Sequence, residues 1–334
     1  MAKAQVRERT GRSILFFLLG LLVVSGCDSA GGYRLVNGPA ESIGPGGTPA
    51  AAVAASNSSE PILGSSTQAP MPTDAAAPTA PEAVGSASVE RSKANETSLI
   101  ALLTRYSAVK PQKWGERLPG VGTHLQTKEN VIALTFDACG GKEGSGYDEK
   151  LINYLVKEQI PATLFMNARW IDANPETFAK LAANPLFEIE NHGTEHRPLS
   201  VTGRAAYGLA GTRDVSGAIE EVTGNADKIE KLTGRRPLFF RSGTAFYDDV
   251  ALQIVHDLGF QAAGYNILGD AGATYNKEQV FKALTKAQSG AIVLAHMNHP
   301  EKDTAEGVMK AIPVLQKAGF RFVQLSSYPL DGSS

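Results

Sequence analysis

Two histidines four residues apart, His192 and His196, form the clearest chemical pattern in the 334-residue chain. Two imidazoles at this spacing, on a helical turn or a tight loop, can bind one divalent ion from the same side. The alternative is that both are solvated side chains of a surface loop. They come directly after an apolar segment that ends at Asn191, and this position favours the metal-binding interpretation.

Four further residues could form an acid–base set: Asp137, Arg241, Asp270 and His296. A histidine can donate a proton to a leaving amine, and a buried arginine or aspartate can fix the protonation state of its neighbours. Taken singly, Asp137 could equally begin a turn, and His296 could be a hydrogen-bonded core residue. Both interpretations remain open at this point.

Short apolar segments alternate with helical patterns from residue 130 onward. Strands are predicted at 131–136, 162–166, 187–190, 238–240, 262–266, 291–295 and 320–325, and helices at 148–159, 175–183, 215–232, 248–258, 278–287 and 306–318. This alternation indicates an α/β fold with a parallel sheet covered on both faces. An open doubly wound sheet and a barrel give the same alternation, but no Gly-x-Gly-x-x-Gly follows a strand, and we favour a barrel.

The candidate residues follow these predicted strands at their C-terminal ends. Asp137 closes the first strand, His192 and His196 follow the third, Arg241 follows the fourth, and His296 closes the sixth. The C-terminal ends of parallel strands converge on one rim, where active sites are built. We therefore expect these residues to meet in one cleft.

The N-terminus resembles the signal peptide of a bacterial lipoprotein. Basic residues precede an uncharged apolar run at 14–24, which is shorter than the roughly 20 residues that a spanning helix needs. The run ends in Val24-Ser25-Gly26-Cys27, which resembles a lipobox, so residues 1–26 would be removed and Cys27 diacylated. A plain signal peptide with an incidental cysteine is the alternative. Asp28 favours retention at the inner membrane, and we expect a lipid-anchored, periplasm-facing envelope protein.

Composition divides the rest of the chain. Residues 27–97 consist mainly of Ala, Pro, Ser, Gly and Thr and are predicted to be a disordered tether, residues 98–127 an N-terminal extension or cap, and residues 128–330 the catalytic domain. The net charge of −2 gives no basic field for nucleic acid, and no obligate protein partner is evident. With Cys27 lipidated, Cys139 is the one remaining thiol and has no partner for an internal disulfide.

The order of motifs over residues 128–327 resembles the NodB-homology polysaccharide deacetylases, carbohydrate esterase family 4. The first motif, normally Thr-Phe-Asp-Asp-Gly, is Thr135-Phe136-Asp137-Ala138-Cys139 here, and the resemblance assigns the catalytic base to Asp137. The second is Asn191-His192-Gly193-Thr194-Glu195-His196, whose two histidines would bind the metal. The family implies a distorted (β/α) barrel of about seven parallel strands.

The remaining motifs supply the partners of these residues. By resemblance, Arg241 in Phe240-Arg241 would hold the base, His296 in Leu294-Ala295-His296 would be the general acid, and Asp270 would tune that histidine. The chain departs from the family in lacking the proline after the arginine and the Asp-Trp near Asp270.

A third departure is more serious, because the family's metal-binding second aspartate is Ala138 here. Water could fill the vacancy with Asp137 nearby as a possible third ligand, and this is our preferred interpretation. Alternatively, the thiolate of Cys139 could substitute, although a neutral buried thiol is favoured, or metal binding could be lost.

The resemblance implies metal-dependent hydrolysis of N-acetyl groups on an envelope or extracellular polysaccharide, with one divalent metal. Zinc is preferred, and cobalt, manganese or nickel are alternatives. The N-acetylated glycan and the membrane would be the partners. A catalytically impaired glycan-binding lipoprotein, an O-acetyl esterase and a small-amide hydrolase are the alternative functions.

Overall fold

The computed structural model describes residues 97–332. The signal peptide, the lipidated Cys27 and nearly all of the tether predicted at 27–97 lie outside the described residues. In the described part, no helix is both long and apolar enough to cross a membrane.

A parallel sheet forms the centre of the fold. Its strands are β2 (Val121–Gly122), β3 (Val131–Ala138), β4 (Ala162–Met166), β5 (Phe187–Asn191), β6 (Phe239–Phe240), β8 (Gln261–Ala263), β9 (Ile267–Leu268), β10 (Ala291–His296) and β11 (Arg321–Val323). Their order is β2-β8-β6-β5-β4-β3-β10-β9, with β11 beside the first half of β3. The expected α/β fold with a curled parallel sheet is confirmed, with nine strands in place of about seven.

The sheet curls because one bent segment reaches both of its ends. β8 pairs with β6 and β2, whereas β9, only three residues further along the chain, pairs with β10. The predicted strand at 262–266 coincides with β8 only at residues 262–263, and its last three residues form the bend that leads to β9. β2 lies before the domain boundary predicted at 128, so the sheet also includes part of the segment expected to be an extension or cap.

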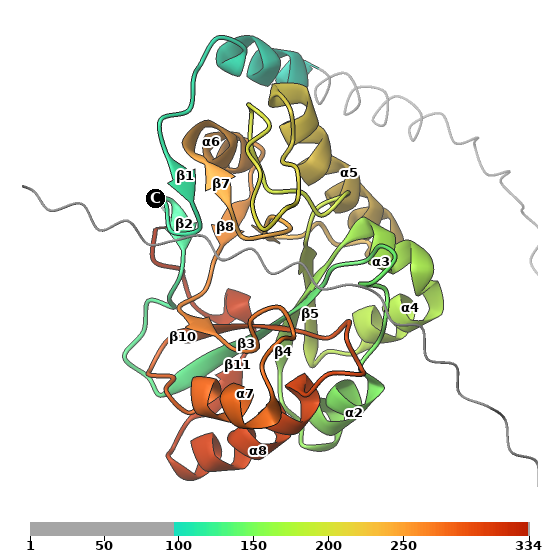
Figure 1. The fold of residues 1–334 in the computed structure, drawn as a ribbon, viewed down its shortest axis with the longest axis vertical. Helices are drawn as coiled ribbons and strands as arrows, with labels where there is room; N and C mark the ends of the chain where they lie inside the picture. Colours follow the sequence, from blue (N-terminus) through green and yellow to red (C-terminus); the bar gives the residue numbers. More distant parts are fainter. Residues whose placement is uncertain (1–96, 333–334) are drawn as a thin grey trace, which may run out of the picture. The chain divides into compact units, whose positions relative to one another are not determined.

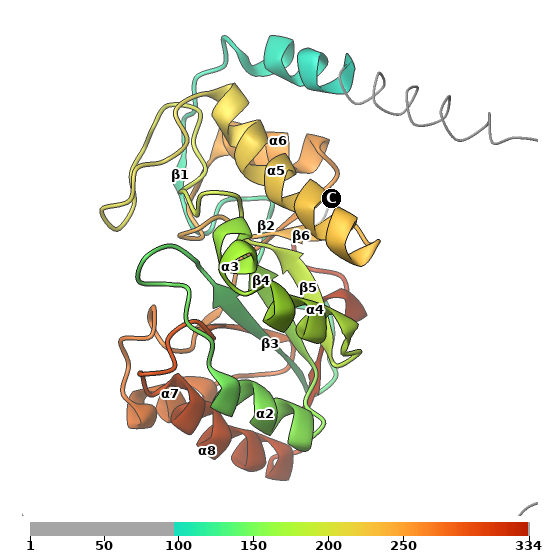
Figure 2. The ribbon, with the colours of Figure 1, turned by 90° about the vertical axis from the view of Figure 1, so that its right-hand side faces the viewer.

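Helices cover the outside of the sheet. They are α2 (Glu149–Lys157), α3 (Ala168–Ala173), α4 (Pro175–Ala183), α5 (Val215–Thr233), α6 (Asp249–Asp257), α7 (Lys277–Leu284) and α8 (Thr304–Lys317), with residues 97–106 also helical. α2, α7 and α8 lie on one side of β3 and β4, and α5 and α6 lie toward the other end of the sheet (Figures 1 and 2). α5 ends at Gly234, whose φ of 72° is the left-handed conformation that glycine adopts readily at a helix end.

Side chains alternate across β3 and β10, as the two-residue period of a strand requires. Ile132 and Leu134 of β3 pack in the cluster beneath the outer helices, whereas Val131 and Ala133 pack in a second cluster with Ile292 and Leu294 of β10. Asp137 lies four residues after Ala133, and His296 lies two residues after Leu294. The two-residue period of a strand therefore puts both polar side chains on this second face. The strand period therefore brings two ionisable side chains to the same end of the barrel interior.

A separate two-stranded sheet borders this end of the barrel. β1 (Trp114–Gly115) pairs antiparallel with β7 (Tyr247–Asp248). The segment before the barrel is thereby attached beside the loop that follows β6.

Candidate active site

Asp137 and His296 lie side by side at the ends of adjacent strands. They are paired residues in the parallel register of β3 and β10, and the backbone N–H of Met297 donates to the Asp137 carbonyl. Asp137 is 3% exposed. The strand pairing therefore brings a carboxylate next to an imidazole.

Arg241 holds Asp137 in place. Its Nη1 donates to Asp137 Oδ1 at 2.7 Å and to Thr135 Oγ1 at 2.9 Å, while Nε and Nη2 donate to the carbonyls of Ala263 and Gly264. The guanidinium also lies over the ring of Phe165, 4.1 Å from its centroid. Burial alone would raise the pKa of Asp137, but the Arg241 guanidinium together with His192 and His296 outweighs it and holds that pKa below its usual range. Asp137 therefore remains a carboxylate.

Asp270 binds His296 in a corresponding way. Its Oδ1 lies 2.9 Å from His296 Nδ1, and Oδ2 accepts from the His296 backbone N–H and from the Thr304 hydroxyl. Burial opposes a charged imidazole, but the adjacent Asp270 carboxylate raises the pKa of His296 well above its usual range. With Nδ1 engaged by Asp270, His296 Nε2 is the nitrogen available to donate a proton.

The two histidines of the second motif meet at the same rim. Their ring centroids are 4.8 Å apart, and His192 Nε2 lies 3.6 Å from Asp137 Oδ2. His192 Nδ1 lies 2.9 Å from the carbonyl of Arg241, which fixes the proton on Nδ1 and leaves Nε2 as the lone-pair nitrogen. His196 Nε2 is buried and has no hydrogen-bond partner.

Glu221 of α5 shapes the loop that carries these histidines. Its carboxylate accepts from the backbone N–H groups of Glu195 and Arg197. A Cβ on Gly193, where φ is 79°, would lie 2.3 Å from Glu221 Oε1. A Cβ on Gly243 would likewise lie 2.3 Å from the His196 carbonyl carbon. Both glycines are therefore required for the loop to approach its supports.

Cys139 lies beside both histidines. Its Sγ is 3.9 Å from His192 Nε2. The donor atoms of Cys139, His192 and His196 all lie within 4.8 Å of one another. Burial disfavours the thiolate, but the neighbouring imidazoles of His196 and His192 hold the pKa of the Cys139 thiol well below its usual range.

Glu116 is a site residue that the sequence did not reveal. A cavity of about 380 Å³ opens over Asp137, His196 and His296, and Glu116 lines it. The hydroxyls of Tyr207 and Tyr265 donate to the two carboxylate oxygens of Glu116 at 2.6 and 2.7 Å.

These hydrogen bonds connect three separate segments across the cleft. The bond to Glu116 raises the pKa of Tyr207 to about 12, and burial together with the same carboxylate raises that of Tyr265. Trp114, two residues before Glu116, offers the one sequence signal that could have drawn attention to this segment.

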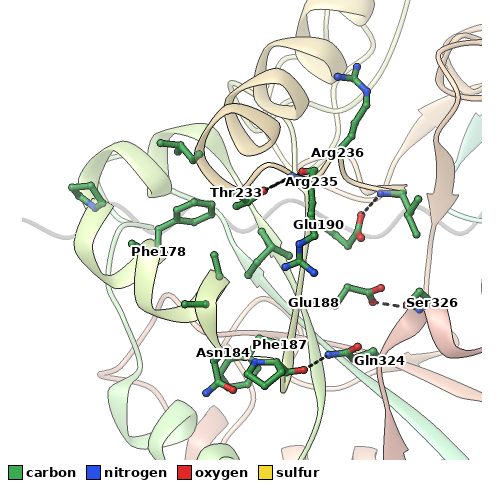
Figure 3. A pocket seen from close by; sticks show the side chains of 18 residues that line it. Phe178, Asn184, Phe187, Glu188, Glu190, Thr233, Arg235, Arg236, Gln324 and Ser326 are labelled. Carbon is green, nitrogen blue, oxygen red and sulfur yellow. Dashed lines mark hydrogen bonds between the residues drawn. The ribbon is translucent and has the colours of Figure 1, made fainter. Parts of the chain in front are cut away.

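A larger hollow, of about 1010 Å³, lies elsewhere in the molecule (Figure 3). It is lined from α4, the end of α5, most of β5 and the residue just before β6, with Phe178, Glu188, Glu190 and Arg235 among its side chains. None of the predicted site residues lines it. We place the candidate site at the smaller cavity, where the ionisable side chains meet.

The polysaccharide deacetylase family model matches residues 124–263. Among curated proteins, the chain is 25% identical over 220 residues to an uncharacterised protein of Streptomyces coelicolor, covering 64% of this chain and 79% of that one. It is 26% identical over 206 residues to a peptidoglycan-N-acetylglucosamine deacetylase of Bacillus cereus, covering 60% and 89%. It spans 61% of the length of a third relative, the Bacillus subtilis protein YlxY.

Similar solved structures show the same fold. A carbohydrate esterase family 4 pseudoenzyme from Bacillus anthracis superposes with a TM-score of 0.53 at 19% identity, covering 64% of this chain and 69% of that one. A family 4 carbohydrate esterase from Bacillus subtilis superposes with a TM-score of 0.51 at 22% identity, covering 69% and 88%. A mutant of the pseudoenzyme with restored activity has a TM-score of 0.53 at 20% identity, covering 64% and 72%.

Proposed function

We propose that this chain, for which the family model and the shared fold support a place among the polysaccharide deacetylases, hydrolyses N-acetyl groups on an envelope polysaccharide with the help of one divalent metal. The main support is the pairing of Asp137 and His296 in adjacent strands. Arg241 is the buried partner of Asp137, and Asp270 is the buried partner of His296. Pure binding of a glycan requires no such acid–base set.

The donor atoms around the rim fit a metal. His192 presents Nε2 with its other nitrogen anchored on a carbonyl, and His196 Nε2 is buried without a partner. A buried nitrogen without a hydrogen bond is costly unless something else binds it. His192 and His196 would therefore hold the ion, for which zinc is our first candidate. When bound, such an ion polarises a carbonyl and lowers the pKa of water.

The chain's own residues provide the proton transfers. Asp137 keeps Oδ1 on Arg241 and can take a proton from the attacking water on Oδ2. The water oxygen bonds to the acetamide carbon as the C–N bond breaks. His296, with Nδ1 held by Asp270, gives a proton to the departing amine from Nε2. The products are acetate and a free amino sugar.

The polymer substrate is proposed from two observations. The Bacillus cereus relative is a peptidoglycan-N-acetylglucosamine deacetylase by name, and the lipobox-like Cys27 would attach this chain to an envelope membrane, with Asp28 favouring the inner one. We propose peptidoglycan or a neighbouring N-acetylated glycan as the substrate class.

The test uses the full chain purified without chelator. Metal content and acetate release are measured on N-acetylglucosamine oligomers and on peptidoglycan, and an O-acetylated glycan is tested in parallel. Near-stoichiometric metal with acetate release, both lost in His192→Ala, is expected. Asp137→Asn should lose release and keep the metal, which would identify Asp137 as the base.

The same experiment decides between the alternatives. Ala138 and the pseudoenzyme among the similar structures motivate a glycan-binding protein without activity. Glycan binding without acetate release from any substrate would overturn the deacetylase proposal. Release from the O-acetylated glycan alone would replace it with an esterase.

A further inference from the structure

We propose that the thiolate of Cys139 is the third protein ligand of the metal, in the place of the carboxylate that the chain lacks at Ala138. This inference rests on the proposed function, because it concerns the same metal. It gives the chain a cysteine–histidine–histidine centre in place of an aspartate–histidine–histidine centre.

The spacing of the three donors suits a single ion. Cys139 Sγ lies 3.9 Å from His192 Nε2, and the three donor atoms of Cys139, His192 and His196 are all within 4.8 Å of one another. Zinc–sulfur bonds of about 2.3 Å and zinc–nitrogen bonds of about 2.0 Å at tetrahedral angles place such donors roughly 3.5 Å apart. A contraction of about one ångström therefore completes the triangle around an ion.

The backbone after Cys139 has the shape needed to keep the thiol at the rim. Gly140 and Gly141 have φ values of 70° and 84°, and a Cβ on Gly140 would lie 2.5 Å from the Trp170 backbone nitrogen. The Gly140 N–H donates to the Gly144 carbonyl, which closes a tight loop. Only glycine fits this turn, and the turn begins directly at Cys139.

Asp137 is poorly suited to be the third ligand. Its Oδ1 is committed to Arg241, and although Oδ2 lies 3.6 Å from His192 Nε2, Asp137 does not belong to the group of three donors that includes His196. A carboxylate used as a ligand would also lose basicity. Assigning Cys139 to the metal leaves Asp137 free as the base, whereas the interpretation preferred from the sequence used Asp137 and water to fill the vacancy.

A thiolate ligand can be observed directly with cobalt. The full chain carrying Cys27→Ser, in which Cys139 is the one cysteine, is stripped of metal and titrated with Co²⁺. We expect visible bands of tetrahedral cobalt together with a near-ultraviolet sulfur-to-cobalt charge-transfer band. Cys139→Ala in the same background should lose the charge-transfer band and weaken zinc binding by more than about 100-fold, since the loss of an outer partner alone costs about 10–100-fold.

A second variant separates coordination from folding. Ala138→Asp with Cys139→Ala restores the carboxylate at the adjacent position, and we expect it to bind Co²⁺ without the charge-transfer band. Circular dichroism checks that each variant folds. In the Cys27→Ser chain, zinc should also slow the reaction of the single thiol with a disulfide reagent by at least tenfold.

The outcomes distinguish this inference from the proposed function. Cobalt bands without charge transfer, with a thiol equally reactive with and without zinc, would overturn the role of Cys139 and leave the metal site standing. Failure of Cys27→Ser and of the carboxylate variant to bind either metal would overturn both.

Discussion

Arg241 connects three strands through one side chain. It follows β6, donates to the carbonyls of Ala263 and Gly264 at the end of β8, and binds Thr135 and Asp137 of β3. A guanidinium can do this because its donors lie in a rigid plane, whereas an ammonium is a compact charge on a flexible stem. At the residue scale, Arg241 is both a structural bridge and a partner that keeps Asp137, the proposed base, ionised.

Arg241→Lys tests this double role. We expect the free energy of unfolding to fall by roughly 2–3 kcal/mol, because buried acceptors lose their donors while the charge stays buried. Acetate release should fall more than about tenfold as Asp137 loses its orientation. Denaturant titration and an acetate assay measure the two effects. The exposed Arg235→Lys is the matched control, and equal effects at both positions would contradict the assigned role.

At the scale of elements, the loop of the second motif depends on the loop that follows β6. Gly243 lies against the backbone of His196, which itself has a φ of 58°. A non-glycine residue in this region is strained and persists only when its surroundings enforce it. The position of His196, one of the two proposed metal ligands, is therefore enforced by a glycine on a different loop.

Gly243→Ala should displace that histidine. The new Cβ would lie only 2.3 Å from backbone atoms of His196, which would have to shift. We therefore expect the free energy of unfolding to fall by about 2 kcal/mol and the zinc content to drop clearly. Gly217→Ala is the control, because its Cβ would meet no atom closer than 3.5 Å and alanine favours the helix by roughly 0.5–1 kcal/mol. Metal analysis and thermal unfolding provide the readouts. Full zinc occupancy in Gly243→Ala would contradict the coupling.

The Glu116 carboxylate joins three elements over the cleft: the segment after β1, the loop with Tyr207, and Tyr265 between β8 and β9. We expect Tyr207→Phe to raise KM on glycan oligomers about fivefold with little change in kcat, as the loss of one hydrogen bond of about 1 kcal/mol at a binding surface predicts. Tyr154→Phe, on α2, is the control. A fall in kcat with KM unchanged would mean that the contact serves the chemistry.

On the scale of the whole molecule, Glu190 makes stability depend on pH. Its carboxylate accepts from the backbone N–H groups of Leu238 and Phe239, and it lines the larger hollow (Figure 3). Burial, with help from Glu188, raises the pKa of Glu190 well above its usual range despite those bonds. The folded protein therefore keeps a proton that the unfolded chain releases near pH 4.3, and stability falls as pH rises from there through the folded pKa.

Glu190→Gln removes this ionisation and keeps an acceptor for the backbone. We expect its advantage in melting temperature over the unmodified chain to grow steadily between pH 4.5 and pH 8, because the unmodified chain alone must keep a proton on this carboxyl. Thermal unfolding at several pH values measures the difference. Exposed Glu278→Gln should show a constant difference, and parallel curves for Glu190→Gln would contradict the buried proton.

The sequence predicted those strands and helices whose pattern of apolar and polar residues repeats over several residues. The seven predicted strands and six predicted helices each have a counterpart in the structure. The longer ones follow strand or helix periods visible over five or more residues, whereas the two-residue β6 is marked by its apolar pair, Phe239-Phe240. β2 and β9 have two residues each and no period. α3 begins within two residues of β4, where an apolar run gives no sign of a helix start.

The candidate site, too, was only partly predictable from the sequence. Asp137, Arg241, Asp270, His192, His196 and His296 lie at one rim, as strand-end positions suggested, although their roles remain predictions. Glu116 lies in a segment without strand or helix pattern, and only the antiparallel pairing of β1 with β7 brings it to the cleft. The orientation of Cys139 toward the histidines depends on two left-handed glycines, which sequence alone does not distinguish from an ordinary turn.

The pairing of Asp137 with His296 has a consequence for how such a protein can diversify. Neighbouring strands are about 4.8 Å apart, so the distance between base and acid is set by main-chain geometry common to all parallel sheets. Under the proposed function, the residues that would contact a sugar polymer include Glu116 and Tyr207, which line the cavity from segments outside the main sheet. Mutations there can retarget the protein to a new glycan while the proton-transfer geometry is inherited unchanged. A library confined to 203–211 and 111–119 should therefore yield altered preferences far more often than dead variants.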